Sequence, residues 1–312
     1  TVLVPMAGYG KRFADAGYDL PKALLPVSGR PMVIQATRDL PDAPATRFVM
    51  RLDLDMLDEL LVRLRSSFIG VSTLLLSEGT EGQAITCRLG IADINPDEPL
   101  TIGACDNAMI YDVQKFEAMI APGGPDVLVW IVRGHADGRL RPKNFGWVDA
   151  DADGRIAGVR VKQEPDDPAT APMIVGAFTF RRAGDFDRAC QALIDRDGRV
   201  NGEFYVDSLI ADAVALGLDC RIFEIDHYLG WGTPNDLRTF EYWQSCFHKW
   251  ASHPYRLERD RRVPAAKVAE LAAHYADIPS PRPAGVMSAP AATSAQQPSH
   301  KFRWPWQRKG RG

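Results

Sequence analysis

A short stretch near the start of the chain combines glycine and positive charge in a spacing that suits anion binding. Gly8 and Gly10 follow an apolar run, and Lys11 and Arg12 come directly after them. Glycines let backbone amides approach a ligand closely, and amides at a turn from a strand into a helix form a concave anion site. Lysine and arginine add charge-assisted hydrogen bonds to such a site. The stretch therefore predicts a site for a triphosphate or a pyrophosphate.

A further cation follows this stretch behind a proline. Lys22 comes directly after Pro21, whose ring fixes the local backbone and helps to aim the lysine. Two familiar phosphate loops do not fit, because a dinucleotide motif G-x-G-x-x-G would need a glycine at Phe13 and a Walker A loop would need G-x-x-x-x-G-K-[ST]. The alternative without a function is a plain turn with a solvated basic pair. Spacing alone indicates a phosphate chain and no particular reaction.

The composition is that of an ordinary globular protein. The 312 residues are 46% hydrophobic and 25% charged, with a formal net charge of -3. A chain of this length can form one large α/β domain or two smaller ones with a sizeable core. A charge balance so close to neutral provides no argument for nucleic-acid binding, so nucleic acid is not an expected partner.

The start of the chain and its cysteines favour a reducing cytoplasm. A strand-like run begins directly after Thr1, which predicts no signal peptide, and no apolar stretch approaches the roughly 20 residues that span a bilayer. The cysteines have neither C-x-x-C nor His/Cys metal spacing, so buried thiols are expected. The five cysteines are Cys87, Cys105, Cys190, Cys220 and Cys246.

Apolar runs alternate with segments of helical periodicity in the first part of the chain. This alternation predicts parallel βαβ units in an open, doubly wound sheet, whose ligands lie beyond the carboxyl ends of the strands. We expect strands at residues 1–7, 45–52, 71–77 and 98–105, the last ending at Asp106, and helices at 30–40, 55–68 and 82–94.

The pattern changes from about Gly123 onward, where several strands follow one another. Asp153-Gly154 is a strong hairpin signal between two of them, so we expect an antiparallel extension beside the parallel strands. The expected strands here are 126–134, the two halves of 145–163, 171–182 and 220–226, and the expected helices are 183–195, 236–253 and 264–277.

Two linked stretches, PMAGYGKRF and LPKALLPVSGRPMV, resemble the signature of the sugar-phosphate nucleotidyltransferases, such as the glucose-1-phosphate thymidylyl- and uridylyltransferases. The family pattern is roughly G-x-G-x-R followed by P-K-x-L. Three later stretches come in the family's order. EGTEGQAITCRLG is similar to the family segment that lines the base and ribose, and PLTIGACDNAMIYD is similar to the strand that delivers a metal-binding aspartate. YLGWGTPNDLRTFE is similar to the family motif W-L-D-x-G-T-P-x-D-L. The resemblance covers roughly Val2 to Trp243.

The resemblance implies a fold and a reaction. The fold is α/β, with a mostly parallel Rossmann-like or GT-A-like sheet, an antiparallel extension on the acceptor side and C-terminal helices. In the reaction, a phosphate monoester attacks the α-phosphorus of a nucleoside triphosphate and pyrophosphate leaves, so neutralisation and alignment of two anions are the main tasks. The implied partners are the triphosphate and a phosphorylated acceptor, and the implied cofactor is Mg²⁺. A homo-oligomer is compatible with this reading.

The resemblance also implies roles for individual residues. Arg12 would hold the β- and γ-phosphates, and Lys22 would bridge the α-phosphate and the incoming phosphate. Asp106 would hold Mg²⁺, with Asp226 as candidate second ligand because the family's second aspartate is replaced by Gly230. The other candidates are Ala7, Gly8, Gly10, Lys11, Gly82 and Gln83 for the nucleotide, with Ser77 and Glu78 near the base, and Lys162, Gly176, Glu203 and Tyr205 for the acceptor.

Departures from the family pattern leave the substrate open. The family's E-K-P, which meets the sugar phosphate, reads VKQEP here. A sugar 1-phosphate is the default acceptor, and a cytidylyltransferase acting on a phosphorylated alcohol is the alternative. A non-catalytic nucleotide-binding module is favoured by Gly230 and opposed by the retention of Arg12, Lys22 and Asp106. A glycosyltransferase would need Asp-x-Asp at the strand end, where CDNA offers one acid.

Three regions are expected along the chain: a catalytic domain over 1–243, a helical extension over 244–278 and a disordered Pro/Ala/Ser-rich tail over 279–312. The tail ends in KFRWPWQRKGRG, which combines basic and aromatic residues without an acid. Such a segment predicts weak contact with an anionic membrane surface, and a solvated end without a partner is the alternative.

Overall fold

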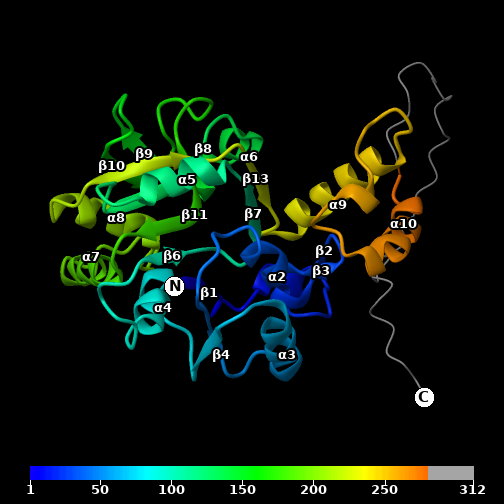
Figure 1. The fold of residues 1–312 in the computed structure, drawn as a ribbon, viewed down its shortest axis with the longest axis horizontal. Coiled ribbons are helices and arrows are strands. Elements are labelled where there is room, and N and C mark those ends of the chain that lie inside the picture. The colour runs from blue at the N-terminus through cyan, green and yellow to red at the C-terminus, as the bar shows by residue number, and fades with distance from the viewer. Residues whose placement is uncertain (280–312) are drawn as a thin grey trace. The chain divides into compact units, whose positions relative to one another are not determined.

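The computed structural model describes residues 1–279 (Figure 1). These residues pack into two compact units, of which the first comprises Thr1–Tyr9 and Ala36–Leu229, and the second Gly10–Gln35 and the chain from Gly230 onward. The predicted boundary at residue 243 lies inside helix α9 (Pro234–Lys249), and the division into 1–243 and 244–278 stays a prediction. The predicted tail and its membrane contact lie, from residue 280 on, outside the described residues.

A nine-stranded sheet forms the centre of the first unit. Its strands lie in the order β10-β9-β11-β6-β1-β4-β5, and β8 pairs with both β11 and β12. The bounds are β1 Val2–Pro5, β4 Thr46–Arg51, β5 Val71–Leu76, β6 Leu100–Ile102, β8 Val127–Val132, β9 Gly146–Ala150, β10 Ile156–Val161, β11 Met173–Phe180 and β12 Cys220–Glu224.

The central strands of this sheet are parallel, as the alternating pattern predicts. β1 pairs in parallel with β4 on one side and β6 on the other, and β4 pairs in parallel with β5. Their carboxyl ends therefore lie along one edge, which is the edge where ligands bind in folds of this kind. The predicted fold class, an α/β Rossmann-like sheet with mostly parallel central strands, is confirmed.

The predicted antiparallel extension is also present. β9 and β10 pair as an antiparallel hairpin around Asp153-Gly154, and β11 runs antiparallel to β6, β8 and β9. The register between β11 and β8 shifts between Ile174 and Phe178. Gly176, inside this interval, has a φ of 78°, and a left-handed residue in a strand produces such a bulge.

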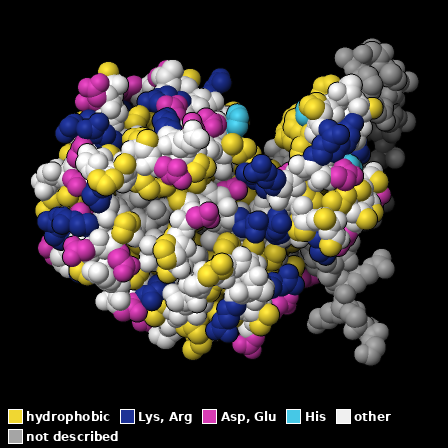
Figure 2. All heavy atoms as spheres, viewed as in Figure 1, with side chains coloured by type: hydrophobic (Ala, Val, Ile, Leu, Met, Phe, Trp, Pro, Cys, Tyr) yellow, Lys and Arg dark blue, Asp and Glu magenta, His cyan; other side chains and the backbone are white. Residues whose placement is uncertain are grey.

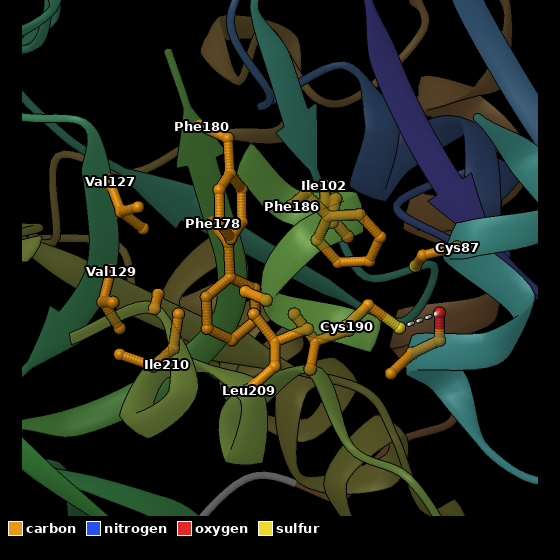
Figure 3. Packing of buried hydrophobic residues seen from close by; sticks show 14 of the residues in the cluster. Cys87, Ile102, Val127, Val129, Phe178, Phe180, Phe186, Cys190, Leu209 and Ile210 are labelled. Atoms are coloured by element: carbon orange, nitrogen blue, oxygen red, sulfur yellow. Dashed lines mark hydrogen bonds between the residues drawn. The ribbon is translucent and has the colours of Figure 1, made fainter. Parts of the chain in front are cut away.

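Helices α4 (Gln83–Gly90), α7 (Ala183–Asp195) and α8 (Val206–Ala215) pack against one another and against the sheet. Their apolar side chains meet those of β6, β8 and β11 in the core shown in Figure 3. Phe178, Phe180 and Phe186 are fully buried there. The thiol of Cys190 on α7 donates a weak hydrogen bond of 3.8 Å to the carbonyl oxygen of Ala84 on α4, which joins the two helices.

Some sequence-based boundaries were wrong. The strand expected to end at Asp106 ends at Ile102, and a separate short strand, β7 (Asn107–Ile110), follows and pairs with β13 (His227–Gly230). The helix expected over 30–40 is α2 (Met32–Thr37), because Arg30–Pro31 forms strand β3. The remaining elements of this part of the chain are α3 (Leu57–Ser67), α5 (Val113–Ile120), α6 (Ala136–Leu140) and η2 (Pro142–Asn144).

The second unit contains α1 (Lys11–Asp15), η1 (Lys22–Leu24), the hairpin of β2 (Pro26–Val27) and β3, α9, η3 (Leu257–Arg259), η4 (Ala265–Lys267) and α10 (Val268–Ala276). Helix α9 begins at Pro234 because Thr233 caps it, its hydroxyl accepting from the Asp236 amide at 3.2 Å. A small apolar core lies between η3 and α10, around Leu257, Leu271 and Tyr275.

Surface and thiol features agree with the composition. On the face of the first unit seen in Figure 2, acidic and basic side chains are interspersed. Within residues 1–279, no helix has the length and apolar character needed to cross a bilayer. The expected buried thiols are confirmed for Cys87, Cys190, Cys220 and Cys246, whereas Cys105 is half-buried.

Candidate functional site

The glycine-rich loop turns directly into a short helix. Gly10 has a φ of 61°, in the left-handed region, and precedes α1. A Cβ at Gly10 would lie 3.2 Å from Lys22 Cβ, so the loop and the Pro-Lys motif are in direct contact. The backbone at Gly10 therefore favours glycine. At Gly8 φ is not positive and a Cβ would meet nothing within 4 Å, so the backbone there does not require glycine, and the approach of the Gly8 amide to a phosphate stays a prediction.

The predicted phosphate-binding cations differ in exposure. Lys11 and Arg12 are exposed on α1, whereas Lys22 is half-buried at the first position of η1. Pro21 precedes Lys22 with a φ of -53° and a ψ of 142°, so the proline sets the extended backbone from which the lysine departs. Within the second unit, the loop that leads to Arg12 therefore lies against Lys22, the lysine of the Pro-Lys motif.

The turn that follows Lys22 is held by helices at the other end of the same unit. The Ser28 hydroxyl, between β2 and β3, donates to Gln244 Oε1 on α9 at 3.1 Å, and both side chains are buried. A Cβ at Gly29 would lie 2.9 Å from Lys267 Cβ, so the turn also packs closely on η4. The C-terminal helices thus support the segment that carries Lys22.

The residue between the two loop glycines contacts an arginine that sequence reasoning missed. Tyr9 is 71% exposed, and the Arg51 guanidinium carbon lies 3.5 Å from its ring centroid. Arg51 stands at the carboxyl end of β4 and its Nε donates to Asp53 at 2.7 Å. A Cβ at Gly79 would lie 3.4 Å from the Tyr9 hydroxyl. The first unit therefore brings Tyr9 beside the exposed stretch that contains Ser77 and Glu78.

The segment predicted to line the base is hydrogen-bonded to the segment predicted to meet the acceptor. The Phe204 amide donates to the Glu81 carbonyl at 2.8 Å, and the Ala84 amide donates to the Phe204 carbonyl at 2.9 Å. Gly82 lies between these two bonds with a φ of 134°. The structure thus brings together two groups of predicted residues that are far apart in the sequence.

Side chains on both sides of this junction differ in exposure. Gln83 and Tyr205 are half-buried, and Glu203 is exposed. Arg199 connects the two segments a second time, since its Nη2 lies 2.7 Å from a Glu81 carboxylate oxygen and its guanidinium carbon 4.2 Å from the Phe204 ring centroid. Sequence reasoning missed Arg199, whose partners come from two separate parts of the chain.

Asp106 lies in the connection between β6 and β7, next to a buried asparagine. Asn107 is 5% exposed, its Nδ2 donates to the Val175 carbonyl at 3.1 Å, and its Oδ1 has no hydrogen-bond partner. A Cβ at Gly176 would lie 3.6 Å from Ala104 Cβ and 3.8 Å from Asn107 Nδ2. The bulge of β11 therefore places Gly176, a predicted acceptor residue, beside the loop of the predicted metal ligand.

Asp226, the candidate second metal ligand, lies at the far end of β7. Its amide donates to the Ile110 carbonyl at 2.8 Å, whereas Asp106 precedes the first residue of that strand. A strand rises about 3.3 Å per residue, so the backbones at these two points are separated by on the order of 13 Å. The structure does not bring Asp226 to Asp106.

The residues around Asp106 suit a hard cation that takes most of its ligands from phosphate oxygens and water and only a few from the protein. Among the described residues, no three His, Cys, Asp or Glu side chains gather in a group that could hold a metal ion. Mg²⁺ needs no such group, because it is usually held by one or two carboxylates with phosphate oxygens and water. The Asp106 carboxylate and the unpaired Asn107 Oδ1 are oxygen ligands of the kind that Mg²⁺ prefers.

Lys162 is held at the end of β10 in an unusual conformation. Its φ is 56°, a left-handed value that costs a non-glycine residue about 1–2 kcal/mol. Its amide donates to the Phe145 carbonyl at 3.0 Å, its Nζ donates to the Asn144 carbonyl, and its Nζ lies 5.5 Å from the Tyr205 ring centroid. Two predicted acceptor residues, Lys162 and Tyr205, therefore meet, although the chain separates them widely.

A carboxylate that sequence reasoning missed lies near enough to this lysine to feel its charge. Asp207 follows closely after Tyr205 on α8, and burial raises its pKa to about 6, an effect that the charge of Lys162 opposes. A Cβ at Gly146 would lie 2.3 Å from Asp207 Oδ2, so the carboxylate rests on the glycine backbone. No local signal distinguishes Asp207 from the other acids of its helix, because its partners come from β9 and β10.

Comparisons with known proteins agree on the fold. No family model matches this chain, and no curated protein matches it. Solved structures with a similar fold include the nucleoside-diphosphate-sugar pyrophosphorylase from Vibrio cholerae RC9, with a TM-score of 0.63 and 18% identity over 77% of this chain and 99% of that chain. UDP-glucose pyrophosphorylase complexed with UDP-glucose matches with a TM-score of 0.61 and 16% identity, over 77% of this chain and 96% of that chain.

A third similar structure has a different kind of acceptor in its name. The inositol-1-phosphate CTP transferase from T. maritima matches with a TM-score of 0.58 and 15% identity, over 77% of this chain and 93% of that chain. At these identities the likenesses establish the fold. They confirm the structural resemblance to sugar-phosphate nucleotidyltransferases that the motifs predicted.

Proposed function

We propose that this protein is a nucleotidyltransferase that joins a nucleoside triphosphate to a sugar phosphate and releases pyrophosphate. The observation that carries the proposal is the contact between Gly10 and Lys22, because it joins a left-handed glycine turn to a lysine that a proline orients. Backbone amides and ammonium groups in such an arrangement suit a phosphate chain. The likeness of the fold to enzymes named as sugar-nucleotide pyrophosphorylases supports the same reading.

In the proposed reaction, an oxygen of the acceptor phosphate forms a bond to the α-phosphorus while the bond from that phosphorus to the α,β-bridging oxygen breaks. Pyrophosphate carries away the electron pair of that bond. Arg12 would neutralise the β- and γ-phosphates, beside the amides of Gly8 and Gly10, and Lys22 would stabilise the charge that develops between the α-phosphate and the acceptor. Because both reactants are anions, alignment and neutralisation supply most of the catalysis.

The proposed cofactor is Mg²⁺, held by Asp106. When bound, Mg²⁺ would neutralise phosphate charge and favour departure of pyrophosphate. Asp106 and its neighbour Asn107 provide oxygen atoms for such an ion, and the substrate's phosphates would complete its coordination. The position of Asp226 beside Ile110 gives no support to a second carboxylate ligand.

On the acceptor side, we assign Lys162 to the phosphate of the acceptor and Gly176, Glu203 and Tyr205 to the rest of that molecule. A sugar 1-phosphate is the first candidate, and its product would be an activated sugar for surface-glycan synthesis. A phosphorylated alcohol with CTP is the second candidate, because the inositol-1-phosphate CTP transferase shares the fold. Gly82 and Gln83, with Ser77 and Glu78 nearby, are assigned to the nucleoside.

The test is a pyrophosphate-release assay with Mg²⁺, each of the common triphosphates, and two acceptor pools, one of sugar 1-phosphates and one of polyol and choline phosphates. We expect release only when a triphosphate and an acceptor are both present. Release with CTP and the second pool alone would select the cytidylyltransferase reading. Absence of binding of every triphosphate at millimolar concentration would contradict the enzyme proposal and favour a structural module.

A further inference from the structure

The Asp207 carboxylate lies where three parts of the first unit meet. It stands on the first turn of α8, and α8 packs against β10. Its Oδ2 rests on Gly146, the first residue of β9, since a Cβ there would approach it to 2.3 Å. Gly146 is the register partner of Val161, the last residue of β10, and Lys162 follows directly. The carboxylate is therefore set against the end of the strand from which Lys162 departs.

The contacts of Lys162 restrict both its backbone and its side chain, unlike those of a typical solvent-exposed lysine. Its backbone is in the left-handed region, its amide is bonded to Phe145, and its Nζ donates to Asn144. Strained conformations of this kind persist where the surroundings over-determine them, and they concentrate at functional sites. The charge that acts on Asp207 is that of Lys162, which directly follows β10, a strand packed against α8.

We propose that Asp207 is a positioning residue that holds the Lys162 ammonium in place for the phosphate of the acceptor, and that Gly146 is glycine because any side chain would displace the carboxylate. This inference rests on the proposed function for its consequence in catalysis. Asp207 acts through Lys162 and touches no reacting atom. Because burial raises its pKa to about 6, the carboxylate loses its charge as the pH falls through about 6, and the support for Lys162 is lost with it.

The first test measures the NMR signal of the Lys162 side chain in the absence of any substrate. Lysine side-chain NMR signals are recorded from pH 5 to 8, and the Lys162 signal is identified by its absence in Lys162→Arg. We expect the Lys162 signal to shift near pH 6 in the wild type and in Asp212→Asn, and to lose this shift in Asp207→Asn. Asp212 is the matched control, since it lies on the same helix and bonds Arg196 at 2.6 Å. A shift that persists in Asp207→Asn would overturn the proposal.

The second test is kinetic and compares Asp207→Asn with the wild type at each pH. An acceptor phosphate itself titrates near pH 6, so the ratio between the two proteins isolates the enzyme's group. At pH 8 we expect the KM for the acceptor to rise about tenfold, because Asp207→Asn removes the negative charge that attracts the Lys162 ammonium. We expect the ratio to fall toward one at pH 5 and the KM for the triphosphate to stay within about twofold. A pH-independent ratio would overturn the proposal.

The third test uses the contact with Gly146. Gly146→Ala should raise the acceptor KM as Asp207→Ala does, because its Cβ would displace Oδ2. In Asp207→Ala the carboxylate oxygen is absent, so adding Gly146→Ala to that variant should raise the acceptor KM little further. If the effects of the two substitutions on the acceptor KM were additive, the proposal would be contradicted. If the wild type releases no pyrophosphate with any acceptor while the NMR shift near pH 6 is present, the coupling of Asp207 to Lys162 stands and the proposed function is what fails.

Discussion

Gly82 and Phe204 are interlocked by their backbones. A Cβ at Gly82 would lie 2.5 Å from both the amide nitrogen and the carbonyl oxygen of Phe204, and those two groups are the ones that bond to Glu81 and Ala84. Neither group can move aside without breaking a hydrogen bond. The contact therefore connects the segment assigned to the nucleoside with the segment assigned to the acceptor.

Gly82→Ala is expected to break this junction. The backbone at φ 134° is strained for alanine and the new Cβ meets backbone atoms, so we expect a loss of about 2 kcal/mol or more in the free energy of unfolding. The KM values for the triphosphate and the acceptor should rise together. Gly217→Ala is the control: Gly217 has a φ of 80° with nothing within 4 Å, and alanine there should cost about 1 kcal/mol without a kinetic effect. Equal results from the two variants would show that the junction is not needed.

Lys22→Ala is expected to remove charge stabilisation from the transition state. The loss should be about 3–4 kcal/mol, or a hundredfold or more in kcat, with a smaller change in the KM for either substrate. Lys115→Ala is a control, because Lys115 is exposed on α5 and its Nζ lies 5.6 Å from the Phe223 ring centroid. A Lys22→Ala variant within a fewfold of the wild-type kcat would contradict its placement at the reacting phosphates.

Asp106→Asn and Asp226→Asn should differ sharply in their response to Mg²⁺. Asp106→Asn removes the one carboxylate that we assign to the ion, so most activity should be lost and more Mg²⁺ should be needed to recover any. Asp226→Asn should leave the Mg²⁺ titration curve unchanged, because Asp226 lies beside Ile110, at the other end of β7. An equal loss in both variants would show that the two carboxylates share the ion after all.

Gln244→Leu tests whether the C-terminal helices support the Lys22 segment. The change removes the acceptor of two buried hydroxyls, those of Ser28 and Tyr275, and each unpaired buried group costs about 1–3 kcal/mol. We expect a lower free energy of unfolding by urea and a lower kcat. Gln191→Leu on α7 is the matched control, since Gln191 bonds Asp195 at the helix surface. Loss of stability with an unchanged kcat would limit Gln244 to a structural role.

Several features could be predicted from sequence because their causes are local. The period of apolar residues predicted α3, α4 and α7 and the strands between them, and Asp153-Gly154 predicted the hairpin of β9 and β10. The left-handed turn at Gly10 and the fixed backbone before Lys22 follow from the properties of glycine and proline themselves. The boundary at Asp106 was wrong because the strand breaks at Gly103, a turn residue, whereas the expectation followed the apolar run on through Ala104 and Cys105.

The contacts between distant segments were decided by the tertiary structure alone. Periodicity states which face of an element is buried and does not state which element covers it. Phe204 on Gly82, Asp207 on Gly146 and Arg51 on Tyr9 depend on strand order and register, which place residues from separate parts of the chain within a few ångströms of each other. The pairing of β7 with β13 likewise places the Asp226 amide at Ile110, whereas Asp106 lies before the first residue of β7. The sequence by itself thus determined most of the elements and the glycine turn that precedes α1. The packing of the sheet decided which side chains meet, because a non-local contact depends on both segments at once.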